Sequence, residues 1–181
     1  KMKTVIIIHG YPGTGKSTIA SKLAKKHHYA LLNQDAFLFS MNGVKEPNRG
    51  VTSEDHRLAL KNMCTCLKNF MESGRNIVIE GSLVSISNKD PLDIRDFLNI
   101  ARKNAYETII VRLNSNLRTR QQRMEKRKWV VPPKIDLMLQ KAVDSLVIKD
   151  DVNIDTSSKS INAIVNIIEQ FFGSKQYNQS I

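Results

Sequence analysis

The chain has 181 residues, which is enough for one hydrophobic core and short for two, so we expect a single domain over residues 2–172 and a polar tail over 173–181. No apolar run approaches the roughly 18 residues that a membrane-spanning helix needs, and no membrane segment is expected. Cys64 and Cys66 would point about 200° apart on a helix, which argues against a disulfide or a shared metal. Reduced cysteines without an export signal favour a cytoplasmic protein.

The net charge of +11 is concentrated in one part of the chain. Between Arg102 and Lys134 there are ten lysines or arginines against two acidic residues, Glu107 and Glu125. A generally basic surface attracts polyanions of many kinds, whereas one concentrated basic stretch indicates a more local role.

Short apolar runs alternate with helical patterns along the chain. Five strands are predicted, at residues 4–8, 29–33, 76–79, 108–113 and 152–155. The predicted helices span residues 17–24, 53–73, 91–101, 114–128, 134–146 and 161–172. Residues 37–51 contain Gly43, Pro47 and Gly50 and are predicted to form a loop. This alternation is typical of a parallel sheet with helices on both faces, in which ligands bind at the carboxyl ends of the strands.

A phosphate-binding motif is the most specific pattern in the sequence. Residues 10–17 match G-x-x-x-x-G-K-[ST] in full and lie between a predicted strand and a predicted helix. The glycines let backbone N–H groups turn inward around the phosphates of a nucleoside triphosphate. Lys16 is expected to reach the β- and γ-phosphates, and the Ser17 hydroxyl to bind Mg²⁺. The nucleotide-binding residues predicted here are Gly10, Pro12, Gly13, Thr14, Gly15, Lys16, Ser17 and Thr18.

Two acidic residues follow predicted strands beside this loop. Asp35 is a candidate catalytic base, because a kinase must orient or deprotonate the attacking hydroxyl; the alternative is a cap for the segment that follows. Glu80 is a candidate to support Mg²⁺, directly or through water, as the acid at the end of a Walker-B strand does. Substrate recognition and a solvated strand end are the alternatives for Glu80.

Arginines are concentrated on the helix predicted at 114–128. Arg123 and Arg127 lie one turn apart and share a helix face. Guanidinium groups bind phosphoryl oxygens in a bidentate manner, so these two side chains are predicted to stabilise the transferring group. Arg118 and Arg120 are predicted to form a solvated face.

The chain resembles the small P-loop kinases of the adenylate-kinase-like group, in particular the branch of polynucleotide 5′-kinases, chloramphenicol phosphotransferase and zeta-type kinases. The resemblance rests on the phosphate loop and on the segments 34–37, 78–81, 123–127 and 153–157. It implies a three-layer α/β/α P-loop NTPase fold with a five-stranded, mainly parallel sheet, and a short helical lid at about 114–133 that closes to exclude water. It also implies that Asp35 is the base, that Arg123 and Arg127 are paired lid arginines, and that Thr156 contacts the nucleotide near the adenine.

The sequence therefore predicts an enzyme that uses Mg²⁺ and moves the γ-phosphoryl group of ATP to an acceptor hydroxyl. Two acceptors stay open: a 5′-hydroxyl of nucleic acid, which the basic stretch favours, and a hydroxyl of a small metabolite or antibiotic. A rival from another class is a nucleotide-binding regulator whose ATP-driven closure presents the basic helix to a partner. The oligomeric state is left open.

Overall fold

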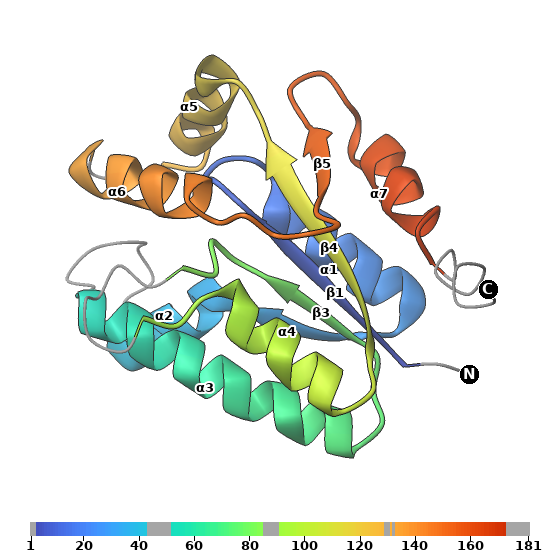
Figure 1. The fold of residues 1–181 in the computed structure, drawn as a ribbon. Helices are drawn as coiled ribbons and strands as arrows, with labels where there is room; N and C mark the ends of the chain where they lie inside the picture. The colour runs from blue at the N-terminus through green and yellow to red at the C-terminus, as the bar shows by residue number, and fades with distance from the viewer. Residues whose placement is uncertain (1–2, 43–51, 85–90, 129–130, 132, 173–181) are drawn as a thin grey trace.

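The computed structural model of the chain describes residues 3–42, 52–84, 91–128, 131 and 133–172. Its centre is a five-stranded parallel sheet with the strand order β2-β3-β1-β4-β5 (Figure 1). The strands are β1 Thr4–Gly10, β2 Ala30–Asn33, β3 Ile77–Glu80, β4 Glu107–Asn114 and β5 Val152–Asp155. All five predicted strands are present, and their ends lie within two residues of the predicted bounds.

Helices cover both faces of the sheet (Figure 1). They are α1 Lys16–His27, α2 Gln34–Asn42, α3 Ser53–Glu72, α4 Ile94–Lys103, α5 Leu117–Lys126, α6 Pro133–Asp144 and α7 Ile161–Glu169. One face packs against α1 and α7, and the other against α3 and α4, with α2 resting on α3. This arrangement confirms the predicted three-layer α/β/α fold.

The central strand β1 shows why the chain folds in layers. Val5 and Ile7 pack into the core beneath α3 and α4, whereas Ile6 and Ile8 pack into the core beneath α1 and α7. All four side chains are fully buried. Because successive residues of a strand point to opposite faces, a continuous run of β-branched residues needs cover on both sides.

Capping residues fix where two of the helices begin. Thr52 forms a capping box with Asp55 at the start of α3. Asp93 forms a second capping box with Asp96, so α4 begins at Ile94 and not at the predicted Pro91. These reciprocal side-chain bonds satisfy backbone N–H groups that have no partner within the helix.

The loop prediction for residues 37–51 is wrong at its beginning. Residues Gln34–Asn42 form α2, and residues 43–51 lie outside the described part of the chain. The helix starts because the Asn33 side-chain oxygen accepts a hydrogen bond from the Ala36 N–H at 2.8 Å. It persists because Leu38 is buried and the helix packs against α3. Gly43, Pro47 and Gly50, on which the loop prediction rested, lie outside the described residues.

Candidate functional site

The phosphate loop joins β1 to α1 through backbone conformations that favour glycine. Gly10 and Gly13 have φ angles of +133° and +77°. A Cβ atom on Gly10 would also clash with the carbonyl oxygen of Leu113 on the neighbouring strand. Helix α1 begins at Lys16 with Gly15 as its N-cap, and no side chain caps its first N–H groups. These amides are therefore available to bind an anionic phosphate.

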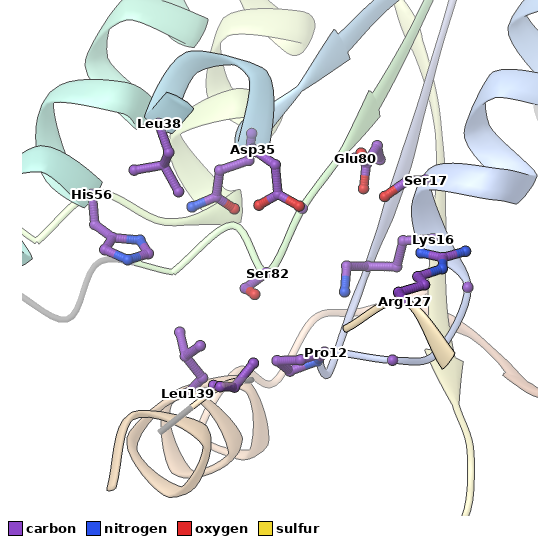
Figure 2. A pocket seen from close by; sticks show the side chains of 15 residues that line it. Pro12, Lys16, Ser17, Asp35, Leu38, His56, Glu80, Ser82, Arg127 and Leu139 are labelled. Atoms are coloured by element: carbon purple, nitrogen blue, oxygen red, sulfur yellow. The ribbon is translucent and has the colours of Figure 1, made fainter. Parts of the chain in front are cut away.

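Lys16 points into a cavity at the carboxyl end of the sheet (Figure 2). Its Nζ donates a hydrogen bond to the carbonyl oxygen of Tyr11 at 2.8 Å. Burial lowers the pKa of Lys16, and the nearby carboxylates of Glu80 and Asp35 act in the opposite direction. An ammonium group that has lost part of its hydration gains more from a phosphate oxygen than one in bulk water does.

Glu80 ends β3 opposite Ser17 and is only 2% exposed (Figure 2). Its carboxylate accepts hydrogen bonds from the Asn33 amide and from the Ser17 side chain. Burial nevertheless raises the pKa of Glu80 to about 7, although Lys16 acts against this shift. The alternative of a solvated strand end is therefore wrong. The site holds a desolvated carboxylate beside a serine hydroxyl, both of which are oxygen donors.

Asp35 reaches the same cavity from the first turn of α2 (Figure 2). Asn33 supplies the side-chain cap of this helix, and the Asp35 carboxylate makes no hydrogen bond to another described residue. Burial raises the pKa of Asp35, and the charge of Lys16 acts to lower it. Asp35 is thus a carboxylate at the edge of the phosphate site that no hydrogen bond from another described residue engages.

Arg120 departs from the prediction that it belongs to a solvated face. The residue is 3% exposed, and its Nε donates a hydrogen bond to the Pro12 carbonyl oxygen at 2.8 Å. Its Nη2 pairs with Asp136 of α6 at 2.8 Å. Arg120, a residue of α5, therefore contacts both the phosphate loop and α6. The spacing Arg120, Arg123, Arg127 places all three on one helix face, and this signal could have identified it. The other arginine of the prediction, Arg118, is exposed.

Arg123 lies on the inner face of α5 and braces the phosphate loop. Its Nη2 donates to the Thr156 carbonyl oxygen at 2.8 Å, and its Nη1 to the Thr156 hydroxyl at 3.0 Å. The Thr156 hydroxyl in turn lies 3.0 Å from the carbonyl oxygen of Thr14. Thr156 is 1% exposed, so the residue predicted to contact the nucleotide is also an internal link between β5, α5 and the loop.

Arg127 lies just after α5 at the junction of two cavities. Its Nη2 donates to the Thr18 hydroxyl at 3.0 Å. The guanidinium borders both the cavity around Lys16 and a second cavity of about 460 Å³ between the phosphate loop, α5 and the start of α7. The second cavity is lined in part by Ile161, Ile164 and Lys159. Its volume lies in the range of ordinary small-molecule sites.

A family model described as an AAA domain matches residues 5–142. The chain belongs to the AAA domain family. The matched region of this AAA domain contains the phosphate loop, both cavity acids and the arginines of α5. No curated protein matches the sequence significantly.

Solved structures similar to this AAA domain include three proteins with kinase names. A candidate kinase from Chloroflexus aurantiacus has a TM-score of 0.70 at 21% identity, covering 94% of this chain and 98% of the other. A gluconokinase from Sinorhizobium meliloti has a TM-score of 0.65 at 18% identity, covering 100% and 99%. The APS kinase of Mycobacterium tuberculosis, in complex with AMPPNP and APS, has a TM-score of 0.63 at 12% identity, covering 96% and 99%. At these identities the similarity establishes the shared fold.

Three polar residues of the cavity were not singled out from the sequence as site residues. Gln34 and Ser82 lie just beyond the ends of β2 and β3, where a strand-end search could have found them. His56 enters from α3, and its place depends on how that helix packs, for which the sequence has no local signal. The described residues of this AAA domain contain no helix with the length and hydropathy of a membrane span.

Proposed function

We propose that this AAA domain is a phosphotransferase that moves the γ-phosphoryl group of ATP to an alcohol. The observation that carries the proposal is the convergence of Lys16, Glu80 and Asp35 in one cavity below the phosphate loop, where the Asp35 carboxylate has no hydrogen bond to another described residue. A nucleotide-dependent switch requires a phosphate loop and a Mg²⁺-supporting acid. It does not require a second carboxylate without a partner beside the phosphate site, whereas a kinase uses one to accept a proton.

In the proposed reaction, the loop amides and Lys16 hold the β- and γ-phosphates. The acceptor oxygen forms a bond to the γ-phosphorus as the bond between that phosphorus and the β–γ bridging oxygen breaks, and ADP leaves. Asp35 accepts the proton of the attacking hydroxyl. Arg127 borders the same cavity and binds the transferring phosphoryl oxygens. The contacts of Arg123 with Thr156 support a positioning role for that arginine.

Mg²⁺ is part of the proposal, with Ser17 and Glu80 as its protein ligands or as ligands of its water. The residues fit this ion because both offer oxygen, and because a nearby cation would stabilise the ionised form of the buried Glu80 carboxylate. In the described residues no group of three or more His, Cys, Asp or Glu side chains is placed to hold a metal. Mg²⁺ commonly retains water and phosphate oxygens as its other ligands, and when bound it neutralises charge on those oxygens.

The nucleoside of ATP is assigned to the second cavity, beyond the phosphate loop. This cavity is continuous with the loop at Thr14 and Gly15 and provides apolar contact at Ile161 and Ile164. The complex of the similar APS kinase with AMPPNP supports ATP as the nucleotide. The segment at about 114–133 is proposed to act as the lid, because α5 carries Arg123 and Arg127 onto the loop.

The experiment is transfer of γ-³²P from Mg-ATP into a library of alcohols by the wild-type protein and by Asp35→Asn. We expect the variant to bind ATP normally and to lose at least about a hundredfold in transfer, as removal of a catalytic base commonly does. Asp150→Asn is the matched control, because Asp150 is exposed and distant from the cavity, and Asn tolerates its φ of +64°. If Asp35→Asn transfers phosphate as fast as the wild-type protein, Asp35 is not the catalytic base. If the wild-type protein binds ATP tightly but transfers phosphate to no alcohol, the alternative of a nucleotide-binding regulator is favoured.

A further inference from the structure

The cavity around Lys16 has two chemically different halves. The phosphate half contains the two cationic side chains of the described lining, Lys16 and Arg127. The half beyond Asp35 is lined, among the described residues, by uncharged polar groups and aliphatic groups: Gln34, Leu38, His56, Ser82, Val131 and Leu139. An acceptor bound next to Asp35 would contact this second half. In Figure 2 the side chains of Leu38, His56 and Leu139 face the same space as Ser82.

His56 is a polar group of this half without a hydrogen-bonding partner among the described residues. It is 6% exposed, and neither ring nitrogen forms a hydrogen bond with another described residue; Nδ1 is buried without one. Burial lowers the pKa of His56, although Asp55 acts to raise it, so the ring is neutral at pH 7. A neutral imidazole offers one donor and one acceptor. A polar group left unpaired in a buried site favours a ligand that can pair with it.

Three arginines of the basic stretch that suggested nucleic acid have other partners in the structure. Arg112 pairs with Asp144, and Arg120 pairs with Asp136. Arg123 is bound to Thr156 on the nucleotide side of the loop. None of these three lines the half of the cavity beyond Asp35. The charges of these three arginines therefore act within the fold and at the phosphate loop, whereas Arg118, Lys126 and Lys134 of the same stretch are exposed.

Charge then decides between the two classes of acceptor. A negatively charged acceptor would lie close to the Asp35 carboxylate, on a side where the described lining contains no cation to offset the repulsion. An uncharged acceptor avoids this repulsion. It also matches the lining, because Leu38 and Leu139 offer apolar contact on either side of the His56 ring (Figure 2).

We propose that the acceptor is a small uncharged alcohol with a second hydrogen-bonding group and an apolar face, and that His56 binds that second group. The inference rests on the proposed kinase function and specifies its substrate class. It excludes the 5′ end of a polynucleotide and the anionic sugar acids. The reaction is the transfer described above: the alcohol oxygen gains the phosphoryl group, Asp35 takes the proton, and ADP is the second product.

The test uses two matched pairs of acceptors within a wider alcohol library. Thymidine and thymidine 3′-monophosphate share the same 5′-hydroxyl and differ by one phosphate. Glucose and gluconate differ by one carboxylate. We expect γ-³²P transfer to favour uncharged acceptors, and within a pair that is used, kcat/KM for the uncharged member should be at least about tenfold higher.

His56 is tested with the best uncharged acceptor. His56→Phe keeps a ring of similar size and removes both hydrogen-bonding atoms, so KM should rise about tenfold while kcat and ATP binding change little. His56→Asn retains a donor and an acceptor and should recover part of the loss. If KM for the acceptor is unchanged in His56→Phe, the assignment of His56 is wrong. If either variant fails to fold, the acceptor preference of the wild-type protein still decides the substrate class.

The outcomes separate this inference from the proposed function. Transfer mainly to thymidine 3′-monophosphate, to oligonucleotides or to gluconate would support the proposed kinase function but contradict the inference that the acceptor is uncharged. Absence of transfer to every acceptor, with tight ATP binding, would overturn the kinase and this inference with it.

Discussion

The clearest quantitative prediction concerns the buried carboxyl group of Glu80. In the ligand-free protein, burial raises its pKa from the ordinary 4.5 to about 7. Below pH 4.5 the group is protonated in both the folded and the unfolded chain, so it contributes no penalty. Between pH 4.5 and 7 the unfolded chain releases this proton while the folded chain keeps it, so the folded state becomes less stable as the pH rises.

The size of the effect follows from the shift. The folded and unfolded pKa values differ by about 2.5 units, and each unit corresponds to 1.36 kcal/mol. The ionised carboxylate therefore costs about 3 kcal/mol of folding free energy above pH 7, fully developed once both states are ionised. Glu80→Gln keeps an oxygen that can accept from Asn33 and removes the charge. We expect this variant to be more stable than the wild type by about 3 kcal/mol at pH 8 and equal to it near pH 4.

The assay is urea unfolding followed by circular dichroism between pH 4 and 8, with a chelator and without nucleotide. Glu72→Gln is the matched control, because Glu72 is exposed at the end of α3 and should shift stability by less than about 0.5 kcal/mol at every pH. A difference between wild type and Glu80→Gln that does not grow with pH would refute the argument. The same variant should lose activity, since the charge that destabilises the empty fold is the one proposed to support Mg²⁺.

Three further predictions concern other buried groups. Arg120→Met should destabilise the fold by about 3–5 kcal/mol in urea unfolding, because it removes the positive charge paired with the largely buried Asp136 carboxylate, which keeps only its hydrogen bond from Gln140 among the described residues; Arg118→Ala on the exposed face should change it by under about 0.5 kcal/mol. Activity should fall with decreasing pH at a pH above the ordinary aspartate pKa of 3.8, because burial raises the pKa of Asp35; a pH–rate profile measures this. Burial raises the pKa of Cys64 to about 12, so iodoacetamide should label it slowly in the native protein and rapidly in urea, as mass spectrometry of the Cys64 peptide can show.

Local sequence was sufficient where chemistry depends on neighbours in the chain. The phosphate loop was predicted because glycine conformations and a helix N-terminus act within eight residues. The strands were predicted because β-branched runs such as Val5 to Ile8 need cover on both faces of a sheet. The helix predicted from residue 53 begins there, because the signals for a helix start lie within one helical turn.

Packing decided what local patterns left open. The charged pattern of α5 is compatible with arginines that are exposed or buried. Arg120 is buried because the tertiary fold places the Pro12 carbonyl oxygen and the Asp136 carboxylate next to its guanidinium group. The first residues of the loop predicted at 37–51 are helical instead, because Leu38 is buried and α2 packs against α3. His56 joins the cavity because α3 crosses the sheet at that position.

The sequence by itself determined the class of fold, the phosphate loop and the identity of the two acids beside it. These features follow from the spacing of apolar residues, from the residues of a turn and from the residues that end a strand, all of which are properties of short segments. The tertiary structure alone decided which charges are buried and which are paired. Desolvation and hydrogen bonding of these charges depend on groups that are distant in the chain, as Glu80 is from Ser17 and Arg120 from Pro12. For that reason the half of the cavity that contains Leu38, His56 and Leu139 could be described only after the chain was folded.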